Sequence, residues 1–500
     1  MYLVVIALSA LVLTLTAPVY PLLSGRWALT AVAGATTLPP LVGVCVARYA
    51  LRRIEADPAQ PARGQAAYAR GMTLLHGLLA LGHGGVLLAT DWLPSCRRLP
   101  VVGEWPAVPG TLALAPLLTS VVLVWIALYP ADRAVRQIAL ELYLMRGRPL
   151  RPVWRLVQYV VYNLRHQVLF VLAPMLLILL ASDIIERYAP PLARLTGLRY
   201  AADLLIGAAA IGVAVITPAV LRYVWVTQRL PDGPLRDRLL VLADKLRLRV
   251  REILVWRSGG MLVNAAVMGV VAPLRYVLIT DGMLEQMDDA KIEAVFGHEA
   301  GQVKRHHILF FLLFACISGC AATVVMLRTQ PLARPEPVLY QFLMAAGGAA
   351  LLLKWGVLFG WLSRRFERQA DVFGVRTLAL SGLPCAQPCL VHGAGDDPAP
   401  APQRGPLCTT AAHVFSEALH EVAVLNGIRP EARSWRHSSI SSRSRFVQEL
   451  AQQPDRLRRF ERRVGAAKAV VLVAAAVCAA WAAHDLGLWR ALADMAQRLT

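Results

Sequence analysis

The chain has 500 residues, 57% of them hydrophobic, with a mean hydropathy of +0.51. Soluble globular domains rarely reach such values, so the composition excludes an ordinary soluble protein and predicts several membrane spans. The formal net charge is +20. No RNA-binding signature accompanies it, and no basic run is interleaved with aromatic residues, so we do not expect a nucleic-acid partner. Arginine-rich loops beside anionic lipid head groups explain the charge, which makes the lipid bilayer the expected partner.

Apolar stretches of about 20 residues, long enough to cross a bilayer, recur along the chain. We expect nine spans, near residues 2–23, 27–50, 72–93, 108–130, 167–185, 203–226, 307–328, 339–362 and 466–484. The first span lacks a preceding basic segment, which favours a retained helix over a signal peptide. The expected fold is mainly α and multi-span. We predict three parts: a membrane domain of about six spans at 1–226, a domain at 227–465 that includes a transmembrane hairpin near 307–362, and a C-terminal span and tail at 466–500.

The loops between the spans alternate in arginine content. Residues 48–70 and 131–166 are rich in arginine, and the loops next to them are poorer. Because cytoplasmic loops carry the excess of basic residues, counting spans places 227–306 and 363–465 together at the cytoplasmic face. The abundance of Ala and Arg is typical of a bacterium with a GC-rich genome. We therefore expect a multi-pass protein of a bacterial cytoplasmic membrane.

The polar segment after the sixth span mixes helix and strand patterns. LRDRLLVLADKLRLRV (235–250) predicts an amphipathic helix. EILVWRS (252–258) and LRYVLITDGML (274–284) predict strands, and NAAVMG (264–269) predicts a further or edge strand. DDAKIEAVFGHEAGQVKRHH (288–307) predicts a helix that begins near Asp288 or Asp289. Residues 381–410, rich in Pro, Gly and Ala, predict a loop.

The stretch GHEAGQVKRHH (297–307) begins like the zinc-binding helix H-E-x-x-H, with Gln302 where the second histidine is expected. After the next two spans, SRRFERQAD (363–371) places Glu367 and Asp371 one helical turn apart. Alone, each segment is equally well a charged helix at the membrane boundary. The hairpin between them returns Glu367 to the face that carries His298, so the two helices can share a metal ion.

Four segments in this order resemble the membrane-embedded M48 zinc metallopeptidases (Ste24/HtpX-like): NAAVMG (264–269), EAVFGHEAG (293–301), SRRFERQAD (363–371) and WRHSSISSR (435–443). The resemblance covers roughly residues 235–450. It implies a gluzincin-type domain with a small β-sheet, interrupted by a transmembrane hairpin. It also implies one zinc ion and the hydrolysis of membrane or membrane-proximal polypeptides.

The resemblance implies a role for each matching residue. His298 and Glu367 would bind zinc, and Gln302 takes the place of the missing ligand histidine. Glu299 would take a proton from the attacking water. Asp371 would orient the ring of His298.

Substrate handling is implied for residues of the first and last segments. Asn264 and Ala265 would lie on the edge strand that pairs with an extended peptide. His437 and Arg443 would stabilise the oxyanion of the tetrahedral intermediate. On the sequence alone, the last two would be a polar surface patch.

Because Gln302 replaces a zinc-ligand histidine, the sequence does not decide whether the chain is an active peptidase. A neutral amide is a much poorer zinc ligand than imidazole. We do not expect His306 or His307 to replace it unless the helix unwinds, because eight residues of helix separate His306 from His298 by roughly 12 Å along the axis. The alternative is therefore a catalytically dead pseudopeptidase that serves as a membrane scaffold or binds clients. The sequence leaves the oligomeric state open.

Two further hypotheses rest on isolated residues. A transporter would explain the ionisable residues within spans, which are Asp183, Lys354, His76 and His83. A second metal site is conceivable among Cys385, Cys389, Cys408, His392 and His413, although their spacing fits no zinc module well.

Overall fold

The computed structural model describes residues 21–56, 62–99, 105, 107–145, 153–196, 201–260, 262–332, 335–383, 385, 391–392, 405–432 and 437–485. Its contacts divide the chain into two units, Met1–Val226 and Thr227–Thr500. Helix α19, Pro454–Asp485, runs without a break through residue 465. The separation of a C-terminal part at 466–500 stays a prediction.

The described part of the first unit is helical. Its helices are α2 (Gly25–Ala56), α3 (Ala62–Ala89), α4 (Trp92–Arg97), α5 (Ala107–Ala113), α6 (Ala115–Met145), α7 (Leu156–Asn163), α8 (Phe170–Arg187), α9 (Ala189–Thr196) and α10 (Ala201–Val224). A π-helix, Leu164–Leu169, joins α7 to α8. Helix α2 packs against α3 and α6, and a Cβ atom on Gly71 would lie 2.1 Å from a methyl carbon of Val46. Small residues of this kind let membrane helices approach closely.

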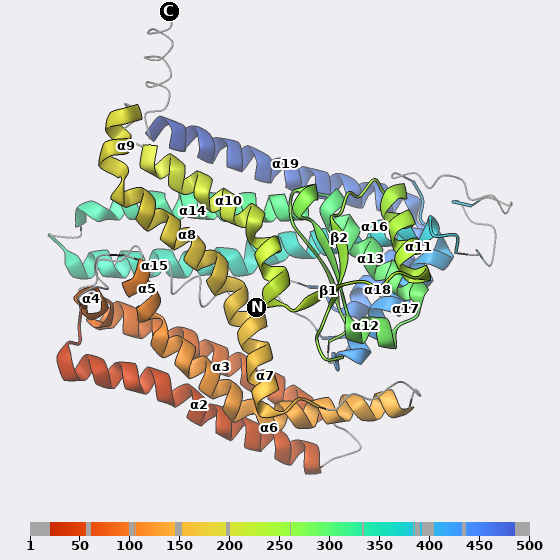
Figure 1. The fold of residues 1–500 in the computed structure, drawn as a ribbon, viewed down its shortest axis with the longest axis horizontal. Coiled ribbons are helices and arrows are strands. Elements are labelled where there is room, and N and C mark those ends of the chain that lie inside the picture. Colours follow the sequence, from red (N-terminus) through yellow and green to blue (C-terminus); the bar gives the residue numbers. More distant parts are fainter. Residues whose placement is uncertain are drawn as a thin grey trace, which may run out of the picture. The chain divides into compact units, whose positions relative to one another are not determined.

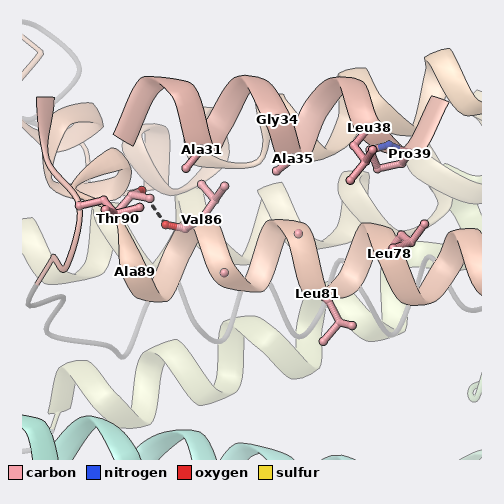
Figure 2. Close-up of a pocket in the computed structure, with 13 residues that line it drawn as sticks. Ala31, Gly34, Ala35, Leu38, Pro39, Leu78, Leu81, Val86, Ala89 and Thr90 are labelled. Atoms are coloured by element: carbon pink, nitrogen blue, oxygen red, sulfur yellow. Dashed lines mark hydrogen bonds between the residues drawn. The ribbon is translucent and has the colours of Figure 1, made fainter. Parts of the chain in front are cut away.

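A groove of about 450 Å³ lies between α2 and α3 (Figure 2). Its lining is apolar apart from Thr90, whose hydroxyl donates to the carbonyl of Val86 at 2.6 Å. No ionisable side chain is among the lining residues. The four ionisable residues predicted within spans lie on three helices: His76 and His83 on α3, Asp183 on α8 and Lys354 on α15.

The second unit contains a four-stranded sheet in the order β1-β2-β4-β3. Its strands are β1 (Thr227–Arg229), β2 (Glu252–Trp256), β3 (Ala265–Met268) and β4 (Tyr276–Thr280). β2 and β4 pair in parallel, and the outer pairs are antiparallel. The two central strands are apolar and buried, as parallel strands require. β3 is an edge strand, as predicted, whereas the sequence analysis did not anticipate β1.

One predicted strand is shorter than expected. LRYVLITDGML was expected to be extended throughout, but β4 ends at Thr280 and Asp281–Gln286 form helix α12. The Thr280 hydroxyl accepts a hydrogen bond from the N–H of Met283 at 3.2 Å. This side-chain cap satisfies a donor of the first helical turn and so starts the helix there.

Helices complete the second unit (Figure 1). They are α11 (Pro234–Lys245), α12 (Asp281–Gln286), α13 (Asp289–Lys304), α14 (His307–Thr329), α15 (Pro337–Lys354), α16 (Gly360–Ala379), α17 (Thr409–Leu425), α18 (Ile440–Gln452) and α19. A π-helix, Trp355–Phe359, joins α15 to α16 without a break. Helix α14 packs on α15 and on α19, and α13 packs on β3 and α16. The predicted hairpin is thus present, and its second arm continues into the helix that carries Glu367.

Eight helices of the described residues are long and apolar enough to cross a membrane. They correspond to all the predicted spans except 2–23, of which residues 2–20 lie outside the described part of the chain. The predicted fold is confirmed: the protein is a mainly α, multi-pass membrane protein with a small sheet and a transmembrane hairpin.

Two glycines bring α13 against α16. A Cβ atom on Gly297 would lie 2.8 Å from Cβ of Thr377, and one on Gly301 would lie 2.9 Å from Cβ of Phe373. Carbon atoms do not approach so closely, so neither position accepts a larger residue without movement of the helices. These glycines flank His298, and the contact they permit places His298 beside the carboxylates of α16.

Candidate active site

His298 is held in one orientation by α16. Its Nδ1 lies 2.9 Å from Oδ1 of Asp371, and both side chains are buried. Because a carboxylate accepts, Nδ1 carries the proton and the lone pair is on Nε2. Burial lowers the pKa of His298, but the hydrogen bond and charge of Asp371 outweigh burial and raise it above its ordinary value. In its neutral form the ring has its lone pair on Nε2, the nitrogen that lies 3.8 Å from Oε2 of Glu367.

Glu367 meets three basic groups at one oxygen. Its Oε2 lies 3.8 Å from Nε2 of His298, 3.3 Å from Nδ1 of His437 and 3.5 Å from Nη1 of Arg443. The first contact joins α13 to α16, as the sequence analysis expected. The other two bring residues from α18, and from just before it, to the same carboxylate.

Arg443 forms a two-point ion pair with Asp371, the carboxylate that orients His298. Its Nε donates to Oδ2 of Asp371 at 2.9 Å and its Nη2 donates to Oδ1 at 2.5 Å. This two-point geometry is the strongest arrangement for an arginine and a carboxylate. The sequence analysis did not foresee this contact, because residues 371 and 443 lie on different helices and neither periodicity nor spacing connects them.

Glu299 belongs to α13, and its carboxyl contacts the edge strand β3. Loss of solvent raises the pKa of its carboxyl to about 7. The charge that His298 carries when it is protonated opposes the rise, and the charge of Glu367 adds to it. A hydrogen bond from the backbone of Val267 in β3 also favours the charged form. The sequence analysis did not identify Val267 as part of the site.

The edge strand offers backbone groups beside Glu299. The N–H of Asn264 donates to Oγ1 of Thr280 at 2.9 Å, so Asn264 faces β4. Backbone groups alternate along an antiparallel strand, so Ala265, like Val267, directs its N–H away from β4. Asn264 is exposed at the start of this edge.

Gln302 occupies the place of the absent histidine. Its Nε2 lies 3.2 Å from Nε2 of His298, where the amide can donate to the lone pair. Two donors of the expected zinc set, His298 and Glu367, stand 3.8 Å apart, a separation that ligands of one zinc ion can have, given bonds of about 2.0–2.2 Å. Turned over, the amide would present its oxygen as a third, weaker donor. His298 and Glu367 therefore fit a zinc ion as ligands, and Gln302 can supply a weaker third donor.

The two histidines after α13 do not join the site. His306 has a left-handed backbone, with φ at 57°, and ends the helix. His307 contacts Oε1 of Gln369 through Nε2 at 2.9 Å and stacks on Phe366. Neither replaces the missing ligand.

Residues 230–396 match the family described as Peptidase family M48. No curated protein matches the chain. Among solved structures, the crystal structure of S. mikatae Ste24p is similar, with 13% sequence identity and a TM-score of 0.47, and the match covers 85% of this chain and 99% of that one. The predicted resemblance to peptidase family M48 is confirmed for residues 230–396, which contain the first three of the four segments. The fourth segment, residues 435–443, lies outside the matched range.

Proposed function

We propose that this protein is a membrane-embedded zinc metalloendopeptidase that cleaves membrane or membrane-proximal polypeptides at the cytoplasmic face. One observation carries the proposal. His298 Nε2 and Glu367 Oε2, from two helices that a transmembrane hairpin connects, lie 3.8 Å apart. Asp371 turns the His298 lone pair toward that space. A histidine oriented by a carboxylate and facing a second carboxylate is the donor arrangement that zinc requires.

Zinc would be held by His298 Nε2 and the Glu367 carboxylate, with the Gln302 amide oxygen as a weak third donor. When bound, the ion supplies Lewis acidity to the scissile carbonyl and acidity to a water molecule. Arg443 keeps the two carboxylates of α16 charged in a buried setting, because it contacts both.

The chain's own residues perform the proton transfers and the substrate alignment. Glu299 accepts the proton of the attacking water and delivers it to the departing amine. Ala265 pairs with the backbone of an extended substrate, which adds a strand to the edge of the sheet. His437 is 45% exposed at its side chain and donates to the oxyanion from the solvent side.

The cytoplasmic orientation rests on the arginine-rich loops at 48–70 and 131–166. The spans between these loops and the site place His298 on the same side. Substrates would be polypeptides whose cleavage site lies in or near the bilayer, and lipid head groups would contact the basic loops.

A second candidate, a pseudopeptidase that binds clients without cutting them, is favoured by one contact. The Gln302 amide at 3.2 Å satisfies the His298 lone pair in the absence of zinc. A metal ion has to displace this hydrogen bond before it can bind.

The zinc content of the detergent-purified chain separates the two candidates. The peptidase requires that His298→Ala lose about one zinc ion per chain relative to the native protein, and that the native protein cleave fluorescein-labelled casein. The pseudopeptidase requires that native and His298→Ala proteins hold equal zinc, that Gln302→His gain about one ion, and that casein stay intact with the native chain.

A further inference from the structure

Two cysteines and a histidine meet between the end of α16 and the start of α17. One ligand atom from each of Cys385, His392 and Cys408 lies within 4.8 Å of the others. Among the described residues, this is the one such group of three His, Cys, Asp or Glu side chains. Two further residues, His413 and Cys389, were also expected as candidate ligands. His413 stands apart on α17, 71% exposed and 4.0 Å from Glu417, and Cys389 lies outside the described residues.

The sulfur atoms have the separation of two thiolates on one metal ion. Sγ of Cys385 lies 3.7 Å from Sγ of Cys408, and no disulfide joins them. Two sulfurs bound to a tetrahedral zinc ion at about 2.3 Å are about 3.8 Å apart. Thiolate sulfur with imidazole nitrogen is a donor set that selects zinc over magnesium or calcium.

The histidine has a protonation state that suits metal binding. Nε2 of His392 lies 3.1 Å from the carbonyl oxygen of Ala379, the last residue of α16. A carbonyl only accepts, so Nε2 carries the proton in this contact and the lone pair is on Nδ1, which is then able to bind a metal ion. Ligand histidines commonly donate their other N–H to a carbonyl in this way, which fixes the tautomer and the ring.

The surroundings stabilise thiolates. Cys408 is the N-cap of α17, and its Sγ accepts from the N–H of Ala411 at 3.5 Å. The backbone N–H groups at a helix N-terminus interact favourably with a negative charge placed there. The hydroxyl of Thr410 lies 3.4 Å from Sγ of Cys385 and can donate to it.

We propose that Cys385, His392 and Cys408 form a second, structural zinc site, distinct from the site at His298. Binding releases the two thiol protons and leaves zinc with two thiolates and a neutral imidazole. The ion ties the start of α17 to the segment that follows α16. Both helices border the candidate active site, since α16 carries Asp371 and α17 places Phe415 with its ring centroid 6.4 Å from that of His298.

Cobalt(II) gives a readout that the His298 site cannot produce. Thiolate ligands on cobalt absorb in the near ultraviolet by charge transfer, whereas nitrogen and oxygen ligands do not. The full chain, purified in detergent, reduced and stripped of metal, is titrated with cobalt(II) and then with zinc(II). The proposal requires a charge-transfer band that saturates at about one cobalt per chain and disappears when zinc displaces the cobalt.

Cys408→Ser is the decisive variant. Serine is a good N-cap, so it keeps the start of α17 while removing the thiolate. The matched control is Cys316→Ser, which changes a cysteine on α14 outside the group. We expect the band in Cys316→Ser and its loss in Cys408→Ser and in Cys385→Ser. We expect His392→Ala to bind cobalt more weakly, and zinc to raise Tm in Cys316→Ser but not in Cys408→Ser.

Three results would overturn the proposal. The first is the absence of the band from the reduced native chain. This includes a chain that is purified with a Cys385–Cys408 disulfide and takes up no cobalt once the disulfide has been reduced. The second is a band that persists in Cys408→Ser. The third is a His392→Ala variant with native affinity. Because His298→Ala leaves this band untouched, failure here and failure at the active site are distinguishable.

Discussion

The amide nitrogen of Gln302 lies 3.2 Å from Nε2 of His298, the ring nitrogen that faces Glu367. The amide thus takes the position, one helical turn after His298, from which a second histidine would share the metal ion. Because the amide competes with zinc for the same lone pair, zinc affinity at this site should be lower than that of a site with two histidines.

Gln302→His should therefore raise zinc affinity, by more than the roughly 10- to 100-fold that an outer-sphere partner contributes. The new imidazole lies on the helix face of His298. Competition with a chelating dye measures the affinity, with Cys408→Ser as the background so that only this site is titrated. Gln302→Leu is the control and should bind no more tightly than the native chain. Equal affinities in Gln302→His and Gln302→Leu would show that this position does not face the metal.

Asp371→Asn should weaken zinc binding by about 10- to 100-fold. Asparagine keeps the size of the side chain but loses the charge that holds the proton on Nδ1 of His298. The same dye competition measures the effect. Asp455→Asn, at a carboxylate 87% exposed on α19, should bind zinc as the native chain does. An affinity unchanged in Asp371→Asn would remove Asp371 from the proposed site.

Arg443→Ala should lower the stability of the chain, because it leaves the Asp371 carboxylate buried without its two-point partner. Breaking a buried pair of this kind typically costs about 3–5 kcal/mol. The fall in Tm, followed by intrinsic fluorescence on heating, is the readout. Arg445→Ala, two residues along the same helix and exposed, should leave Tm almost unchanged. If both variants melt alike, the contact with Asp371 contributes nothing measurable.

Parts of the fold and the site that follow from periodicity and span counting could be predicted from the sequence. His298 and Glu367 were expected together because the hairpin returns the chain to the same face. The ion pair between Arg443 and Asp371 could not be foreseen, because it depends on the tertiary packing of α18 on α16. The sequence named Cys385 and Cys408 together as candidate metal ligands, but the 23 residues between them do not fix the distance between their sulfur atoms. The early end of β4 was missed because the cap at Thr280 overrides the strand pattern.

Glu299→Gln should retain zinc and lose hydrolysis. Glutamine keeps the shape of the side chain but accepts no proton, and general base catalysis typically contributes about 10²- to 10⁴-fold to a rate. Cleavage of fluorescein-labelled casein and zinc content are measured on the same preparation. Glu417→Gln, at an exposed position of α17, is the control and should cleave at the native rate. Cleavage at the native rate by Glu299→Gln would exclude Glu299 as the base.

The orientation of the site can be tested with a biotin-acceptor peptide, which is modified only where the cytoplasmic ligase reaches it. An insertion after Gln453, exposed between α18 and α19, should be biotinylated in intact cells, because the arginine-rich loops place the segment 363–465 in the cytoplasm. An insertion between Pro335 and Glu336, at the turn of the transmembrane hairpin, should stay unmodified, because α14 and α15 carry the turn to the opposite face. The two insertions control each other, since each chain contains the same peptide. The reverse pattern would place His298 outside the cytoplasm and redirect the search for substrates to extracytoplasmic polypeptides.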